Sequence, residues 1–275
     1  MTYISATEVR NRSGAPTSLI TDVQITQYIT EVEAEMARWI NTAFTPKQTI
    51  EIVDGKGTSR MFTKKNPLLS VRAMTLNDST SITPSYIDWY KPSGKMVLSK
   101  SAESSTYTQG HQNTFIKYIY GMVEETTTDT TLSTASTSGT TVSLTVASIT
   151  GFADEDWVEI YGMDGNKEVA QISGTPATST IIVDQLVQSH AADSVIVKLQ
   201  IPEHIKTYML IEASISAAIN AIGATYTFNA SYSLGDLQVT KGVPYTHWRE
   251  SVEKLLKERN MRQSRIRPRP SILVD

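Results

Sequence analysis

The chain has 275 residues and no cysteine, which excludes disulfides, thiolate nucleophiles and zinc sites built on cysteine. It also lacks a long apolar run. The longest apolar stretch, residues 209–223, contains Glu212 and Asn220 and is too short to span a bilayer. No apolar segment follows the charged N-terminus, so no signal peptide is expected. These absences predict a soluble protein made in a cytoplasm.

Catalytic patterns are missing as well. The turn around Gly55-Lys56-Gly57 lacks the upstream glycine of a P-loop, and a hairpin explains it better. The run Asp154-Glu155-Asp156 lacks the spaced oxygens of a calcium loop and is interpreted as an exposed acidic turn. No H-E-x-x-H spacing exists, so the histidines are interpreted as turn or surface residues: His111, His190, His204 and His247. We expect no enzyme, no cofactor and no metal.

Helical periodicity marks both ends of the chain. Ser5 and Glu8 have capping-box spacing, and Gly14 can close the short helix that follows them. Asp22 can cap a longer helix over residues 22–41. Its apolar positions recur every three or four residues: Ile25, Ile29, Val32, Met36 and Ile40. Further helices are predicted after Pro202, ending at Gly223, and from Pro244 to about Asn260.

Short strands are predicted between these helices. Residues 49–53 alternate between polar and apolar, and residues 60–62 look like the strand that returns along them. More strands are expected at residues 70–76, 87–90, 96–99 and 114–120, which together indicate a small antiparallel sheet.

Residues 126–150 change composition sharply, because 16 of these 25 residues are Ser or Thr. A linker is the first interpretation, although the alternation of Val142, Leu144 and Val146 indicates a strand in the later part. Further strands are predicted at residues 157–161, 168–172, 180–183 and 194–199, separated by turn residues. Residues 126–200 are therefore interpreted as an inserted all-β barrel or sandwich.

The predicted fold class is α+β. A helical core of long helices plus a small antiparallel sheet would comprise residues 1–125 and 201–258. The β-domain would be inserted between these two parts, and residues 259–275 would form a basic tail.

The tail is the most informative local feature. Five arginines occur in it with no acid between them: Arg259, Arg262, Arg265, Arg267 and Arg269. One interpretation is a solvated, disordered terminus. Another is a docking tail whose guanidinium groups bind carboxylates or phosphates on a partner. Nucleic acid is less favoured, because no aromatic residue is interleaved and the net charge of the chain is −3.

The order of several motifs resembles the head–tail connector (adaptor) proteins of tailed phages. The matching residues are Thr21-Asp22 with Ile25, Tyr28 and Ile29; residues 57–62 followed by Asn66-Pro67-Leu68-Leu69-Ser70-Val71; Ile201-Pro202-Glu203-His204-Ile205-Lys206; and Ser231-Tyr232-Ser233-Leu234-Gly235-Asp236.

The insertion is similar to small β-domains of phage structural proteins. The matching residues are residues 141–146, Gly151-Phe152, residues 154–156, residues 158–161, Glu168-Val169 and His190-Ala191-Ala192. The acidic turn departs from the usual Gly-Asp pair, because Glu155-Asp156 stands there. The two resemblances together cover nearly the whole chain.

The resemblance implies a structural virion protein of a bacteriophage, located at the head–tail junction. Twelve copies would form a ring that binds the portal protein and a downstream neck, tail or nozzle protein. DNA would pass through the channel of this dodecamer without sequence-specific binding. The five tail arginines would dock on the portal, and the insert would point outward, where it could contact a capsid or fibre protein. No membrane contact is implied.

Two other functions remain open. The chain could be a different neck or tail structural protein that shares the β-domain. It could also be a glycan-binding module, with Trp157 and Tyr161 stacking on sugar, although strand alternation more simply makes one of these two residues core.

Overall fold

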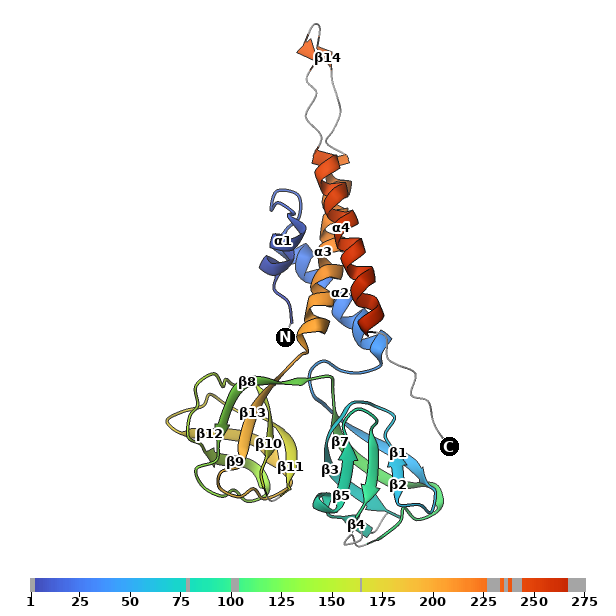
Figure 1. Cartoon of the computed structure of the whole chain (residues 1–275), viewed down its shortest axis with the longest axis vertical. Coiled ribbons are helices and arrows are strands. Elements are labelled where there is room, and N and C mark those ends of the chain that lie inside the picture. The colour runs from blue at the N-terminus through green and yellow to red at the C-terminus, as the bar shows by residue number, and fades with distance from the viewer. Residues whose placement is uncertain are drawn as a thin grey trace. The chain divides into compact units, whose positions relative to one another are not determined.

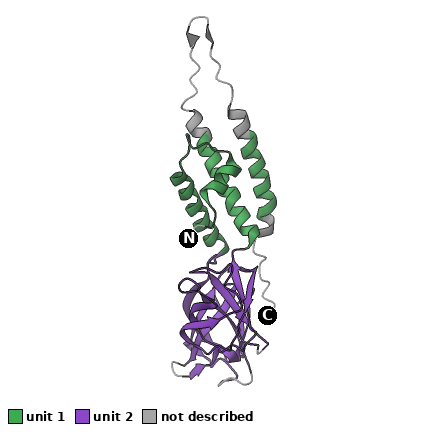
Figure 2. Cartoon of the chain, turned by 90° about the vertical axis from the view of Figure 1, so that its left-hand side faces the viewer, with its two compact units in different colours: residues 1–40, 202–275 green, residues 41–201 purple. Residues whose placement is uncertain are grey.

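The computed structural model describes residues 3–77, 80–99, 104–163, 165–226, 233–234, 237–238 and 244–266. The side chains of residues 222–249 and 264–266 lie outside that description. The chain divides into two compact units (Figure 2). A helical unit comprises Met1–Ile40 and Pro202–Asp275, and a β unit comprises Asn41–Ile201.

The predicted α+β class with a helical core is wrong. The described residues are mostly β, with sheets of antiparallel strands and four α-helices. The small sheet expected to complete a helical core falls instead in the same compact unit as the insert. The prediction failed because local patterns show the individual strands, whereas the packing of the first sheet against the insert depends on residues far apart in sequence, such as Leu69 and Val169.

The helical unit consists of α1 (Ala6–Ser13), α2 (Asp22–Ile40), α3 (Glu203–Tyr226) and α4 (Pro244–Ile266). Helix α3 contacts each of the other three helices (Figure 1). The apolar stripe of α2 is confirmed, because Ile25, Ile29, Val32 and Met36 are buried. Burying such side chains stabilises the unit by about 1.5–3 kcal/mol each. None of the helices in the described parts of the chain is long and apolar enough to cross a membrane.

The start of α1 confirms the capping box. The backbone nitrogen of Glu8 donates to the Ser5 hydroxyl at 3.1 Å, and that of Ser5 donates to the Glu8 carboxylate at 2.7 Å. Gly14 ends the helix with a φ of 72°, a left-handed conformation that glycine adopts without a steric penalty.

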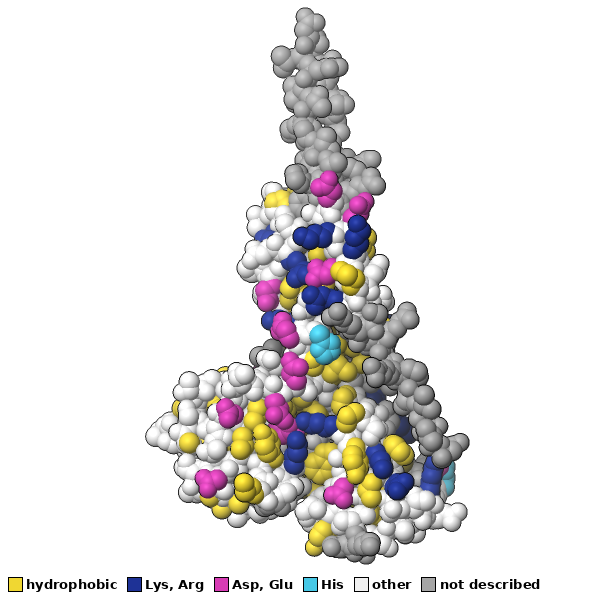
Figure 3. Space-filling model, in the orientation of Figure 1, with side chains coloured by type: hydrophobic (Ala, Val, Ile, Leu, Met, Phe, Trp, Pro, Cys, Tyr) yellow, Lys and Arg dark blue, Asp and Glu magenta, His cyan; other side chains and the backbone are white. Residues whose placement is uncertain are grey.

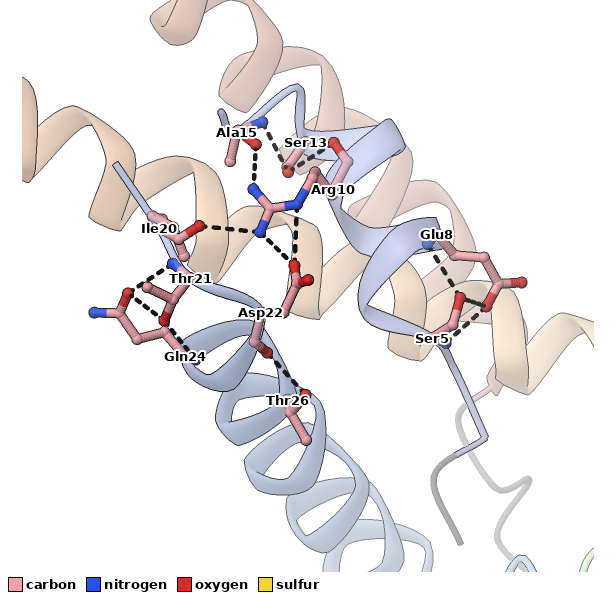
Figure 4. A network of polar contacts seen from close by, with 10 residues as sticks. All are labelled: Ser5, Glu8, Arg10, Ser13, Ala15, Ile20, Thr21, Asp22, Gln24 and Thr26. Atoms are coloured by element: carbon pink, nitrogen blue, oxygen red, sulfur yellow. Dashed lines mark hydrogen bonds and ion pairs between the residues drawn. The ribbon is translucent and has the colours of Figure 1, made fainter. Parts of the chain in front are cut away.

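Helix α2 is capped by Thr21 rather than by Asp22 as predicted. The Gln24 backbone nitrogen donates to the Thr21 hydroxyl, and the Thr21 backbone nitrogen donates to the Gln24 side chain (Figure 4). Asp22 instead pairs with Arg10, whose guanidinium also donates to the carbonyls of Ala15 and Ile20. These contacts fix the connection between α1 and α2.

The first part of the β unit contains two antiparallel sheets. One has the order β1 (Lys47–Gly55), β7 (Gly110–Tyr120), β3 (Leu68–Leu76) and β4 (Thr80–Ile82). The other has the order β2 (Arg60–Phe62), β6 (Lys95–Leu98) and β5 (Ile87–Tyr90), with the 3-10 helix η1 (Pro84–Tyr86) before β5. The predicted strands are confirmed, but β2 pairs with β6 and does not return along β1. Both sheets contribute side chains to one core.

The second part of the β unit begins with β8 (Glu124–Thr131). One sheet has the order β11 (Lys167–Gln171), β10 (Trp157–Tyr161), β13 (Val195–Gln200) and β8. The other pairs β12 (Thr180–Leu186) with β9 (Gly139–Thr145), and both sheets enclose one apolar core. Strand β8 lies partly in the Ser/Thr-rich segment first interpreted as a linker, and it pairs with β13. A short pair of strands that belongs to the helical unit, β14 (Ser233–Leu234) and β15 (Leu237–Gln238), precedes α4.

An apolar cluster joins the two parts of the β unit. Leu69 and Ile119 come from the first part, and Val169 and Leu199 come from the second. Because these four side chains are buried together, the parts share a packed interface.

Candidate docking site on the helical unit

The tail arginines fall partly within α4. Arg259 and Arg262 lie on this helix, and their side chains are described. Arg265 belongs to the last turn of the helix, but its side chain lies outside the described residues. Arg267 and Arg269 lie outside the described residues altogether. The last helix was predicted to end at about Asn260, whereas α4 continues to Ile266.

Arg262 takes part in an ion-pair group that connects the first and last helices. One guanidinium nitrogen of Arg12 on α1 lies 2.7 Å from each carboxylate oxygen of Glu258 on α4. Arg262 lies 3.1 Å from the same carboxylate. Burial disfavours the charged form of Glu258, but hydrogen bonds from Arg12 and attraction to both arginines outweigh it and lower the pKa of Glu258.

Arg259 is held more loosely. Its Nε lies 3.8 Å from the nearest carboxylate oxygen of Glu212 on α3, which is too long for a hydrogen bond. Its guanidinium also donates to the Asn260 side chain at 3.2 Å. About a third of the Arg259 side chain is exposed. A partner carboxylate could therefore bind Arg259 at little cost in lost internal contacts.

A groove of about 380 Å³ lies beside Arg259, and we call it the Trp39 groove. The Trp39 ring stacks on the Tyr208 ring with centroids 6.3 Å apart. Burial, followed by a hydrogen bond to Glu212, raises the pKa of the Tyr208 hydroxyl, which is therefore neutral at physiological pH. The groove is lined by residues of α2, α3 and α4: Val32, Glu35, Met36, Trp39, Tyr208, Glu212, Ser216, Arg259 and Gln263.

The Trp39 groove has the chemistry of a protein-binding surface. It combines a partly exposed tryptophan with carboxylates and a guanidinium, and Trp, Tyr and Arg are enriched at interface hot spots. Within the described ranges, no group of three His, Asp or Glu residues is placed to hold a metal ion.

The other sequence candidates lie apart from this groove. Gly57 adopts a φ of 70° in the turn after β1. Asp154 and Glu155 are exposed, and Asp156 pairs with Lys198 at 2.7 Å.

The predicted histidines lie in different surroundings. His111 is exposed beside Asp54 at 3.0 Å, and His204 is exposed on α3. The surface interpretation is wrong for His190, which is buried with its Nε2 2.9 Å from Glu168. The side chain of His247 lies outside the described residues.

The two aromatic residues of the glycan hypothesis are both half-buried on the same face of β10. Trp157 packs against the apolar cluster that joins the two parts of the β unit. The Lys167 ammonium lies 5.3 Å from the centroid of the Tyr161 ring. Neither ring is an open platform for sugar, so this pair carries no site.

Sequence reasoning missed a buried polar group in the β unit, which we call the Arg72 cluster. It consists of Arg72 on β3 together with Glu168 and His190 from the second part of the unit, and the exposed Asp184 lies at its edge, 3.8 Å from Arg72. Arg72 donates to the carbonyls of Gln185 and Val169 at 2.8 Å each, and it lies 3.5 Å from Glu168. Burial lowers the pKa of Arg72, and the two carboxylates oppose that shift. An arginine in the middle of an apolar strand was the available signal.

Comparison with known proteins finds no family model that matches this chain and no curated protein with significant similarity to it.

Proposed function

We propose that this protein is a structural component of a tailed-phage virion, a head–tail adaptor whose copies form a ring between the portal and the tail. The role is one of binding and assembly rather than catalysis. Twelve copies would surround the DNA channel, with a portal on one side and a neck, tail or nozzle protein on the other.

The observation that carries this proposal is where the adaptor-like motifs fall. Thr21 caps α2, Pro67 stands directly before β3, and Pro202 stands directly before α3. Three separate motifs, in the order that the adaptor resemblance requires, thus coincide with the starts of three elements.

The surface of the helical unit also supports side-by-side assembly. Large apolar side chains are exposed on it, among them Val23 at 80%, Ile219 at 52% and Met261 at 66%. Exposed apolar residues of this kind are frequent at protein–protein contacts. A closed ring needs two different faces on each copy, and residues on separate helices could supply them. Weak individual contacts would then add through avidity.

The portal contact is assigned to the C-terminal arginines. Within the described part of the chain, Arg259 contacts Glu212 at 3.8 Å and donates to the neighbouring Asn260, and the Trp39 groove beside it offers a packing surface for a side chain of the portal. Arginine forks bind carboxylates with defined geometry, so acidic residues of the portal are the expected counterpart.

The test is electron microscopy of negatively stained mixtures of this protein with the portal of the same virus. We expect twelvefold rings that carry added density on one face of the portal. Bare portals beside free wild-type protein would contradict the adaptor role and favour a more distal neck or tail component.

Two variants separate the contributions of the tail. Truncation after Ile266 removes Arg267 and Arg269 and leaves every described helix intact. Arg259→Ala removes the loosely held guanidinium within α4. Both variants should attach to fewer portals than the wild-type protein, while far-UV circular dichroism stays unchanged. Lys257→Ala serves as a control for the loss of one positive charge on α4. Full attachment of both variants would refute docking through the arginines and leave the ring itself in place.

A further inference from the structure

The β unit contains a second groove, distinct from any surface used above, which we call the Trp89 groove. Its volume is about 540 Å³, within the range of small-ligand sites. One wall consists of Pro84 and Ser85 from η1 and residues 87–92 from β5 and the turn after it. The other consists of Gly165, Asn166 and Lys167 at the turn between β10 and β11, together with Gln188. On the face shown in Figure 3, apolar, basic and acidic side chains lie side by side over the β unit.

Aromatic side chains of β5 line this groove. Tyr90 is 52% exposed and shares the outer face of the strand with Asp88. Trp89 points to the opposite face, where it packs against the core and is half-buried. The packing of Trp89 fixes the position of β5, so the groove is lined by rings that lose little entropy when a ligand binds.

The charges around the groove cancel. Lys91 and Lys167 both contact Glu159, a fully buried carboxylate, at 2.8 Å and 3.1 Å. One carboxylate thus neutralises one of the two ammonium groups, and Asp88 in the groove lining balances the other. A phosphate or carboxylate ligand would find no net positive charge here. The groove therefore favours a neutral ligand.

A buried amide supplies a further polar group. Gln188 lines the groove and is only 6% exposed, and among the described residues its Oε1 has no hydrogen-bond partner. A buried acceptor without a partner costs about 1–3 kcal/mol, which a hydroxyl group near it can recover. The neighbouring Asn166 holds the turn in place by donating to the Ser189 carbonyl at 2.8 Å.

We propose that the Trp89 groove binds a neutral saccharide. Carbon-bound hydrogens on one face of a sugar ring would pack on the Tyr90 ring, on the side away from Lys95, whose ammonium lies 5.0 Å from the ring centroid. The sugar hydroxyls would exchange hydrogen bonds with Asp88, Lys91 and Gln188. This binding would be an activity of the β unit in addition to the proposed ring assembly, and neither depends on the other.

The test begins with the full-length protein on an array that carries neutral and acidic oligosaccharides side by side. Neutral glycans that bind are then titrated while tryptophan fluorescence is followed, because Trp89 lines the groove. Tyr90→Ala should weaken binding by at least tenfold. Phe62→Ala is the matched control, because Phe62 is also 52% exposed but lies on β2, outside the groove lining. It should leave the affinity unchanged.

A second variant tests the buried amide without removing an aromatic ring. Gln188→Glu places a charge at the groove and should weaken the binding of neutral glycans, with hydrogen exchange of β10 and β11 unchanged. Binding to acidic glycans alone, no binding on the array, or equal affinities of Tyr90→Ala and Phe62→Ala would each overturn the proposal. None of these results bears on attachment to the portal.

Discussion

The two units use charged side chains in opposite ways. In the β unit, Arg72, Glu168 and His190 are buried and connect two sets of strands. In the helical unit, the pairs between Arg12 and Glu258 and between Arg259 and Glu212 lie at the surface with a quarter to a third of each side chain exposed. Buried charges depend strongly on their partners, whereas exposed pairs contribute little to stability and are easily exchanged.

This difference separates a rigid unit from an adaptable one. The Arg72 cluster and the apolar residues around Leu69 hold the two parts of the β unit together. The helical unit has its charged pairs, the Trp39 groove and exposed apolar side chains near the surface, where a partner can use them. Assembly is therefore expected to alter the helical unit more than the β unit.

The largest effect is expected from Arg72→Ala. The substitution removes the guanidinium beside the buried Glu168 and leaves the Gln185 and Val169 carbonyls without their donor, which should destabilise the β unit by about 3–5 kcal/mol. Hydrogen exchange read by mass spectrometry should show faster exchange in β3 and β11. Arg60→Ala, an exposed arginine on a strand of the same unit, should change stability by less than about 0.5 kcal/mol. Equal effects of the two substitutions would show that the Arg72 cluster does not hold the unit together.

A smaller effect, about 1 kcal/mol, is expected from Arg12→Ala because its ion pair with Glu258 is only partly buried. The pKa of Glu258 is lowered in the folded protein, so this pair stabilises above the unfolded pKa of about 4.3. That contribution is lost as the pH falls through the lower folded pKa. The stability difference between wild type and Arg12→Ala, measured by denaturation at several pH values, should be full at neutral pH and shrink in acid. A difference that grows in acid would contradict this assignment.

The smallest effect is expected from Ser5→Ala, which removes the cap of α1 and should cost about 0.5–1 kcal/mol. The backbone hydrogen bond from Ser5 is the main cause that lowers the pKa of Glu8. That backbone donor remains in Ser5→Ala, and only the hydrogen bond from the Ser5 hydroxyl to Glu8, the second cause, is lost. Nuclear magnetic resonance titration should therefore show a partial return of the Glu8 pKa toward its ordinary value in Ser5→Ala. The return should be smaller in Ser5→Thr, because the threonine hydroxyl can also cap. An unchanged Glu8 pKa in Ser5→Ala would argue against the capping box in solution.

Local patterns predicted individual elements well. Residues 157–161 were predicted as a strand and form β10 with the same bounds, and the capping box at Ser5 is present. The capping box depends on contacts within a few residues, and the strand is marked by a short run of β-branched and aromatic residues between turn residues, so the sequence displays both directly. The cap of α2 was assigned one residue too late, because Thr21 and Asp22 are both good capping residues and only the position of Arg10 makes Asp22 an ion-pair partner.

Long-range pairing was the part that the sequence did not reveal. Strand β2 was expected along β1 but pairs with β6, and β8 was hidden in a Ser/Thr-rich segment because its partner β13 lies far along the chain. The same limit applies to the sites. Arg72 and His190 are far apart in sequence, and only the packing of the two β parts makes them neighbours of Glu168.

The position of the β unit within the chain has a consequence for synthesis. The β unit is one continuous segment between α2 and α3, so the ribosome completes it before α3 and α4 exist. It can fold at that stage, because domains fold as units during translation. The apolar side chains of α2 cannot be buried against α3 until α3 has been synthesised. Until then, Ile25 and Ile29 remain accessible to chaperones and to unintended contacts with other chains.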